Sequence, residues 1–473
     1  MHSHTQRLLP LAASALLSTF AFAQVPMTFG NLVVVRVGDN TSANSNAATP
    51  VFLDEYTPAG TLVQSITLPT AASGANHAFS MSGTATSEGQ VNVSTNGIYF
   101  TLAGYDAAPG TAAIATSAVA TNPRVIARVD IFGNIDTSTA LTDAYDVTNI
   151  RGAVSDDGLR FWTTGATPAS VDPTDGVRFI ANIGDTTSVR INAGAPNNCR
   201  YVSIFHGDLY VTSASGSVRG VARLGNGGLP TSTPEPIVLL NGFPTSAGPS
   251  PYDMFFASPT TIYVADDATN GGGGIKKWEL ISGTWTNTYN LTNGNLGCIG
   301  LSGYVQNGVT TLWATSKDGG GVTSLVSVVD NGAGSPWTTI VPSLTNARFR
   351  GVRRISLPSN SARFPIGCGA ANIKVTGNAE LGTNMFVSMT NSAFGFSLLG
   401  YGLFPAFFPF CGSCTIAHEW TVIVGATDHT LTIAPSWATL GLPIYAQGAD
   451  LLAPGGCADP LLTLTDAVGF TIQ

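Results

Sequence analysis

Residues 207–212 read GDLYVT, a turn followed by an alternating strand, and this stretch decides the fold because it recurs along the chain. The other copies are NGIYFT at 96–101, DGLRFWT at 157–163, TIYVAD at 261–266 and TTLWAT at 310–315. Their aligned aromatic residues lie 49 to 62 residues apart and are Tyr99, Phe161, Tyr210, Tyr263 and Trp313. A four-stranded propeller blade with its loops has about this length, roughly 50 residues. The spacing therefore predicts a β-propeller.

A second element precedes the last four copies and recurs once more near the end of the repeats. It reads NIRGA at 149–153, NCRYV at 198–202, PYDM at 251–254, GCIGL at 297–301 and RFRGV at 348–352. The last copy has no downstream strand, and the N-terminal strand NLVVVRVGD at 31–39 has no upstream partner. We expect these two strands to share one blade, which closes the propeller with six blades. Seven blades are the alternative, because Tyr99 lies 65 residues after Val34 of the N-terminal strand and 62 residues before Phe161, which leaves room for insertions.

The chain of 473 residues carries few charges: 10% are Asp, Glu, Lys or Arg, and the net charge is −8. Soluble domains average about 25% charged residues, and coiled coils need more. Disorder requires low hydrophobicity, whereas 44% of this chain is hydrophobic. Nucleic-acid binders need a basic excess. The composition therefore excludes these classes and favours a loop-rich β protein with no nucleic-acid partner.

The N-terminus has the pattern of a secretory signal peptide. Arg7 precedes an uncharged apolar run at 8–22, and Ala21-Phe22-Ala23 forms an A-x-A cleavage site. We predict a signal peptide at 1–23, cleavage near Ala23, and a secreted or cell-envelope protein. The apolar stretch at 394–410 contains Pro405 and Pro409, so we interpret it as strands and expect no transmembrane segment in the mature chain.

The texture of the sequence changes after the repeats. We predict the propeller at 24–357, a linker at 358–363 and a small β-sandwich-like domain at 364–473, because short apolar strands alternate there with turns. Four of the six cysteines fall in this last region, and we expect two disulfides among Cys368, Cys411, Cys414 and Cys457. A zinc site with four cysteine ligands is the alternative. Whether Cys199 and Cys298 pair stays open.

Two stretches resemble known protein families. The run YDMFF at 252–256, with TIYVADD at 261–267 and GIKKW at 274–278, is similar to an uncharacterised family of secreted bacterial β-propellers. The segments GTATSEG at 83–89 and FRGV at 349–352 fit the same pattern. The tail, with FC at 410–411, CT at 414–415 and ATLGLPIYAQ at 438–447, resembles a C-terminal module of exported planctomycete-type proteins. These resemblances imply fold and export, and no activity.

The charged residues of the second element form the candidate ligand site, because equivalent positions of a propeller face one channel. They are Arg151, Arg200, Asp253 and Arg350. A chain with so few charges buries them at a cost unless they are compensated. One interpretation is a site for an anion or an acidic sugar, since Arg binds carboxylates through two hydrogen bonds. The other is a set of channel groups that satisfy one another and the backbone.

Catalytic and metal motifs give no assignment. The sequence contains no G-x-S-x-G nucleophile motif and no H-E-x-x-H zinc motif. The acidic pairs Asp156-Asp157 and Asp266-Asp267 near blade turns leave calcium as a cofactor hypothesis, although adjacent carboxylates on a strand point to opposite faces. We assign no catalytic and no metal-binding residue.

These observations lead to a functional hypothesis. We expect a secreted, non-enzymatic binding or scaffold protein, in which the propeller is the recognition platform and the C-terminal module serves for attachment. Its partner would be an extracellular ligand, such as a glycan or a cell-surface component, and we expect a monomer. The alternative is a metal-assisted propeller hydrolase or lyase that acts on a small molecule or a glycan.

Overall fold

The computed structural model describes most of the chain outside its N-terminus and parts of its C-terminal region. The described residues are 25–166, 173–192, 194–356, 362–364, 367–368, 371–377, 379, 383–390, 392, 397–403, 405–411, 414–418, 421–433, 443–451, 457–458 and 461–471. The predicted signal peptide at 1–23 lies outside them. Within them the only helix is the 3₁₀ turn η1 (Ile114–Thr116) and the other regular elements are β-strands, so the all-β prediction is confirmed. No described helix is long and apolar enough to cross a membrane.

Four-stranded antiparallel sheets follow one another along the chain between residues 150 and 341. They are β9 (Ile150–Val154), β10 (Phe161–Gly165), β11 (Arg178–Ile180) and β12 (Val189–Arg190); β13 (Tyr201–Phe205), β14 (Asp208–Ser215), β15 (Val218–Leu224) and β16 (Ile237–Leu239); β17 (Pro251–Ser258), β18 (Thr261–Asp266), β19 (Gly274–Ile281) and β20 (Thr284–Leu291); and β21 (Gly297–Gln306), β22 (Val309–Lys317), β23 (Thr323–Val329) and β24 (Trp337–Val341). In each sheet the strands pair in chain order, as in a β-propeller.

A larger sheet holds the two ends of this region. Its order is β25 (Arg348–Arg354), β1 (Leu32–Val37), β2 (Ala48–Tyr56), β4 (Ser80–Ser82), β6 (Tyr99–Tyr105), β7 (Arg124–Asp130) and β8 (Ile135–Leu141). In addition, β3 (Leu62–Thr67) pairs with β2, and β5 (Asn92–Val93) pairs with β6. The strands that the sequence left without a partner, β1 and β25, are antiparallel neighbours, with Val34 opposite Val352.

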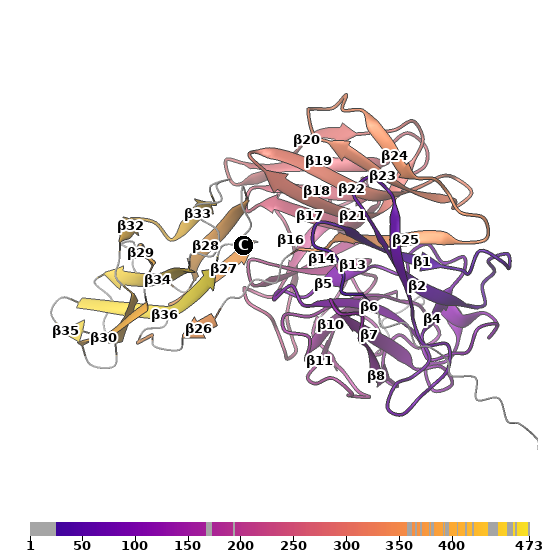
Figure 1. Cartoon of the computed structure of the whole chain (residues 1–473), viewed down its shortest axis with the longest axis horizontal. Helices are drawn as coiled ribbons and strands as arrows, with labels where there is room; N and C mark the ends of the chain where they lie inside the picture. The colour runs from indigo at the N-terminus through magenta and orange to yellow at the C-terminus, as the bar shows by residue number, and fades with distance from the viewer. Residues whose placement is uncertain are drawn as a thin grey trace, which may run out of the picture.

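The C-terminal strands form three further sheets. One contains β26 (Ala362–Phe364), β36 (Leu461–Thr471), β34 (Pro443–Leu451), β29 (Ser397–Gly402) and β32 (Val422–Val424), with β35 (Cys457–Ala458) on β36. The others are β27 (Asn372–Gly377), β28 (Asn384–Thr390) and β33 (Asp428–Thr432), and β30 (Pro405–Cys411) with β31 (Cys414–His418). In Figure 1 they make a separate lobe, orange to yellow, beside the lobe of β1–β25.

The first strands of successive sheets lie side by side and enclose a space that we call the axis. We call β5, β9, β13, β17, β21 and β25 the inner strands. Contacts join β9 to β13, β13 to β17, β17 to β21 and β21 to β25, and β5 lies against β9. Glycines allow this close approach: a Cβ on Gly300 would lie 2.5 Å from the Arg350 carbonyl oxygen, and one on Gly351 would lie 2.5 Å from the Val91 nitrogen.

Tight turns fix where the inner strands end. His206 (φ 54°) and Gly207 (φ 72°) connect β13 to β14, and Asn307 (φ 51°) and Gly308 (φ 78°) connect β21 to β22. Two consecutive positive φ angles define the type I′ hairpin turn, whose twist matches that of the flanking strands. These turns place the ends of β13 and β21 at the same end of the axis, next to β27 and β28 of the C-terminal lobe.

Candidate functional site

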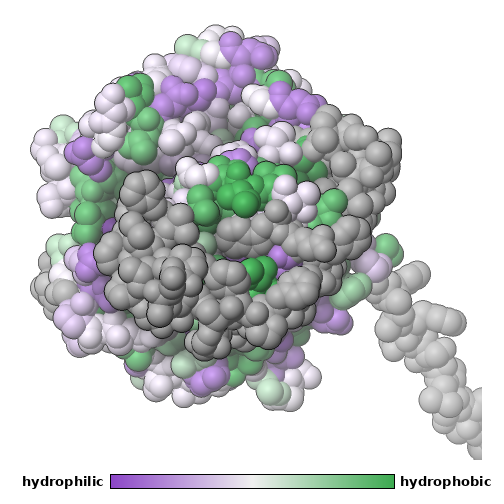
Figure 2. All heavy atoms as spheres, turned by 90° about the vertical axis from the view of Figure 1, so that its left-hand side faces the viewer, coloured by the Kyte–Doolittle hydropathy of each residue, from purple (hydrophilic) through white to green (hydrophobic). Residues whose placement is uncertain are grey.

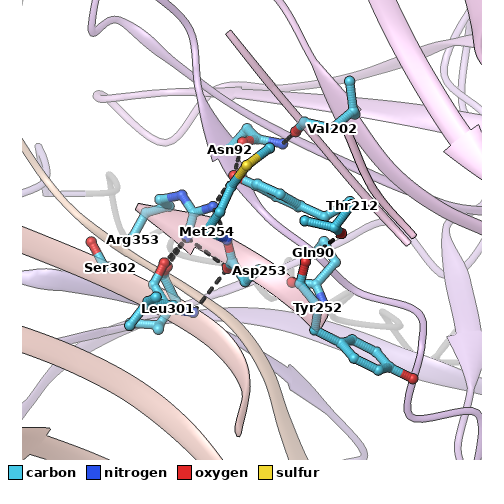
Figure 3. Close-up of polar contacts among 12 residues, drawn as sticks. Gln90, Asn92, Val202, Thr212, Tyr252, Asp253, Met254, Leu301, Ser302 and Arg353 are labelled. Atoms are coloured by element: carbon cyan, nitrogen blue, oxygen red, sulfur yellow. Dashed lines mark hydrogen bonds and ion pairs between the residues drawn. The ribbon is translucent and has the colours of Figure 1, made fainter. Parts of the chain in front are cut away.

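Polar side chains from distant inner strands meet in the axis (Figure 3). Asn92 Nδ2 donates hydrogen bonds to the carbonyl oxygens of Ala153 (2.8 Å) and Val202 (3.0 Å). Gln90 Nε2 donates to the carbonyl oxygen of Ile299 at 2.9 Å. These bonds link β5 and the residues before it to three other sheets, so the axis is crossed by a polar network.

The strongest contact in this network is an ion pair between Asp253 and Arg353. Arg353 Nη1 and Nη2 lie 2.9 and 2.8 Å from the two oxygens of Asp253, so the guanidinium binds the carboxylate through both arms. Asp253 also accepts from the backbone N–H groups of Leu301 (2.8 Å) and Met254 (2.7 Å). Burial alone would lower the pKa of Arg353, but the Asp253 carboxylate and the Tyr201 hydroxyl raise it above its usual value.

A cavity of about 480 Å³ lies above this ion pair, between the ends of the inner strands and the C-terminal lobe. Its polar floor includes Arg353, Tyr201 and Asn92, and its walls include aromatic rings on both lobes. These rings are Phe205, Phe255, Phe256, Tyr304 and Phe386. Figure 2 looks at the face that carries the C-terminal lobe, where hydrophobic residues gather near the centre.

The C-terminal lobe contacts the propeller-like lobe beside this cavity. Phe205 stacks on Phe256 with ring centroids 4.2 Å apart, and Phe386 of β28 meets Phe205 edge-on. Lys374 of β27 reaches Asp208 of β14 at 3.0 Å, and Ser388 Oγ lies 3.3 Å from His206 Nδ1. The cavity is therefore walled by both lobes, a common location for ligand sites.

The charges around the cavity compensate one another. Asp156, which also lines the cavity, is salt-bridged to Arg160 at 2.5 Å. Burial lowers the pKa of His206, so its ring is neutral near pH 7. Because Arg353 is paired with Asp253, the cavity presents hydrogen-bonding groups and aromatic rings with little net charge.

The other end of the axis has the opposite character. Arg350 lies three residues before Arg353 on β25, which is about 10 Å further along the strand. Its side chain is fully buried, and Arg350 Nη2 donates to the Gly83 carbonyl oxygen at 3.3 Å. Among the described residues, no hydrogen-bond partner lies near Arg350 Nε or Nη1, or near Nε of the buried Arg151. Burial lowers the pKa of Arg350 to about 10, and Glu88 opposes this effect.

Glu88 lies next to these two arginines. It is fully buried, its oxygens accept hydrogen bonds from the Tyr105 hydroxyl (2.7 Å) and the Ser82 N–H (2.8 Å), and it interacts electrostatically with both Arg350 and Arg151. Burial raises the pKa of Glu88 to about 7, although these hydrogen bonds and the arginines oppose the increase. Near neutral pH this end of the axis therefore carries an excess of positive charge.

The structure does not bring the four predicted site residues to one point. Asp253 is neutralised by Arg353, and Arg200 lies over the Tyr252 ring with its Nη1 near Ser250 (2.7 Å) and Asp267 (3.4 Å). Arg151 donates to Asn198 (2.5 Å) and to the Cys199 carbonyl oxygen. Asp253 therefore does not share a site with the arginines, because its carboxylate binds Arg353 of β25 instead. Arg151, Arg200 and Arg350 all interact with Tyr252, and Arg151 and Arg350 also interact with Glu88.

Sequence reasoning missed Arg353, Tyr201, Asn92 and Glu88. Glu88 had a detectable signal: it is the only Asp, Glu, Lys or Arg between Glu55 and Asp106. Arg353 had a weaker one, since it stands three residues after Arg350 in the same short strand. Tyr201 and Asn92 carry no charge, and their roles depend on contacts across the axis that no local pattern reveals.

The calcium and cysteine hypotheses have different outcomes. Asp266 and Asp267 are salt-bridged to Lys276 and Lys317, respectively, and in the described part of the chain no group of three or more metal-binding side chains occurs. Cys199 and Cys298 are buried free thiols, so they do not pair with each other. The side chains of Cys411, Cys414 and Cys457 lie outside the described residues, and the disulfides stay a prediction.

Comparisons with known proteins find only distant structural likenesses. No protein-family model matches the chain, and no curated protein matches it. It is similar to an exo-β-1,3-galactanase variant from Phanerochaete chrysosporium with β-1,3-galactotriose (TM-score 0.34, 10% identity, 92% of this chain and 100% of that one). It is also similar to the WD40 domain of Toxoplasma gondii coronin (0.33, 10%, 96% and 89%) and to a polysaccharide lyase (0.29, 11%, 85% and 93%). With TM-scores below 0.5, these likenesses carry no argument about function, and the β-propeller-like fold is defined by the chain's own sheets.

Proposed function

We propose that this chain is an exported binding protein that holds a neutral saccharide in the cavity between its two lobes. In this proposal the first lobe is a six-bladed propeller: β25 and β1–β3 form one blade, β5–β8 the next, and the four-stranded sheets the remaining four. The C-terminal module then completes the binding site, in addition to the attachment role expected from the sequence.

One observation supports the choice of ligand: the cavity combines aromatic walls and hydrogen-bonding groups with little net charge. Ligand sites are mostly apolar, with a few polar groups that fix orientation. Aromatic rings offer flat apolar faces to the C–H faces of a sugar ring, while Asn384 and Ser302 offer hydrogen bonds to its hydroxyls. A charged ligand would leave an uncompensated charge in this site.

Isothermal titration with neutral oligosaccharides of glucose, xylose, galactose and mannose tests this proposal. We expect one of these series to bind and the Tyr304→Ala variant to bind it at least about tenfold more weakly, as is typical for an aromatic anchor. The matched control is Phe132→Ala, because Phe132 is an exposed ring in the β7–β8 turn, outside the cavity.

The same experiment distinguishes binding from catalysis. Intact oligosaccharide after long incubation supports a binding protein, and release of shorter sugars would favour the hydrolase or lyase alternative. If no series binds, or if Tyr304→Ala binds as well as the unmodified chain does, the proposed site is wrong.

A further inference from the structure

We propose that Arg151 and Arg350 form a second binding site, which takes a small oxyanion at the end of the axis opposite the cavity. The ligand class is a carboxylate or a sulfate, either free or carried by an acidic sugar. This site is separate from the saccharide cavity and does not depend on the function proposed for it.

The first argument is the state of the two guanidiniums. Arg350 is fully buried and Arg151 is 9% exposed. Among the described residues, Arg350 Nε, Arg350 Nη1 and Arg151 Nε have no hydrogen-bond partner. A buried charged donor without a partner is costly, and guanidinium nitrogens match the geometry of carboxylate and sulfate oxygens.

The second argument is the balance of charge. The charged groups that interact electrostatically with Glu88 are Arg350 on β25, Arg124 on β7 and Arg151 on β9, and Tyr105 on β6 contacts it directly. Arg124 is engaged by backbone carbonyl oxygens, including those of Tyr145 and Asn122. Because three guanidiniums face one carboxyl that is only partly ionised near pH 7, this end of the axis has a surplus of positive charge that an oxyanion would neutralise.

The third argument concerns access. The segment 83–89 connects β4 toward β5 and covers Arg350, since Gly83 accepts from Arg350 and a Cβ on Gly89 would lie 2.8 Å from the Arg350 side chain. On its other side, Ser87 accepts from Asn149 Nδ2 at 2.8 Å. Arg350 is fully buried and Arg151 is 9% exposed, so an anion would reach the pair from the Arg151 side.

Glu88 makes the binding of an anion dependent on pH. Below the pKa of Glu88, about 7, its carboxyl is neutral and does not repel an anion; above it, the carboxylate competes for the same positive field. For one linked proton, the affinity would fall by up to about tenfold between pH 6 and pH 8. Sulfate is a suitable probe because it does not titrate in this range.

The test is isothermal titration of sulfate and of glucuronate at constant ionic strength. We expect binding at pH 6, at least about tenfold weaker binding by Arg151→Gln, and unchanged binding by the control Arg128→Gln, whose guanidinium is salt-bridged to Asp136 on the outside of the sheet. Glu88→Gln should bind equally at pH 6 and pH 8. Preference for glucuronate identifies a carboxylate ligand, and preference for sulfate identifies a tetrahedral one.

Three results would overturn the proposal. They are the absence of binding by either anion, binding by Arg151→Gln that equals that of the unmodified chain, and an Arg128→Gln effect as large as that of Arg151→Gln. Far-ultraviolet circular dichroism confirms that each variant is folded. Neutral oligosaccharide binding in Arg151→Gln should be unchanged, so that failure of one site is distinguished from failure of the other.

Discussion

Asp253 and Arg350 occupy equivalent places in the fold and have opposite surroundings. Asp253 stands two residues before Phe255, which pairs with Tyr263 of β18. Arg350 stands two residues before Val352, which pairs with Val34 of β1. Both side chains are fully buried. Asp253 has two arms of Arg353 and two backbone N–H groups, whereas Arg350 has one carbonyl oxygen at 3.3 Å. The comparison shows that the repeat defines where a charged side chain lies, and that the neighbouring residues determine whether its charge is compensated.

The largest expected effect comes from breaking the ion pair of Asp253 and Arg353, at the end of the axis next to the cavity. Asp253→Asn keeps the shape of the side chain and removes its charge, which leaves Arg353 buried without a counter-ion. Breaking a buried pair in this way costs about 3–5 kcal/mol in the free energy of unfolding. Urea unfolding followed by circular dichroism measures it.

A matched control is available for this change. Asp136→Asn removes the partner of Arg128, both of which are partly exposed, and should cost less than about 1 kcal/mol. If Asp253→Asn costs no more than this control, the Asp253–Arg353 pair does not stabilise the axis.

The second expected effect concerns the other end and depends on pH. The pKa of Glu88 is about 7 in the folded chain, above its ordinary value of 4.5. A carboxyl with a raised pKa contributes stability that is fully present below 4.5 and is lost as the pH rises through 7. Glu88→Gln should therefore unfold with a higher free energy than the unmodified chain at pH 8, by roughly 2–3 kcal/mol, and should show little difference at pH 4.5.

Urea unfolding at these two pH values measures the difference. The variant can keep the Ser82 bond through its amide oxygen, while its amide group faces the Tyr105 hydroxyl. If the variant and the unmodified chain had equal free energies of unfolding at pH 8, ionisation of Glu88 would not destabilise the fold. The two ends of the axis would then not differ in how well their charges are compensated.

The sequence predicted the architecture well because the architecture is local and repeated. Strands with a period of two, each preceded by a turn, identify themselves, and the aligned aromatics Tyr210 and Tyr263 lie in β14 and β18 as expected. The pairing of β1 with β25 was also predictable, because each strand lacked a partner in the repeat pattern.

The candidate site was only partly predictable because its contacts are not local. The repeat identified Arg350 and Asp253, but Arg353 and Asp253 are 100 residues apart in the chain. The cavity could not be predicted from the sequence, because its wall on β28 depends on how the two lobes pack.

The smallest expected effect concerns the ion pair that joins the two lobes beside the cavity. Lys374 and Asp208 are both partly buried, with side-chain exposures of 20% and 16%. Such pairs contribute about 0.2–1 kcal/mol, and salt screens them. A double-mutant cycle with Lys374→Met and Asp208→Asn should give a coupling energy in that range, which decreases when the salt concentration rises from 0.05 to about 0.5 M.

A coupling energy this small would distinguish two kinds of ion pair at the same end of the molecule. The pair of Lys374 and Asp208 is partly exposed, whereas Asp253 in the pair with Arg353 is fully buried. Arg223 also approaches Asp208, at 3.9 Å, so the carboxylate keeps a cation when Lys374 is removed. Attachment of the C-terminal lobe then depends mainly on the aromatic contacts of Phe386 with Phe205 and His206. A coupling energy above about 2 kcal/mol would contradict this, because it would require a pair as strongly desolvated as Asp253 and Arg353.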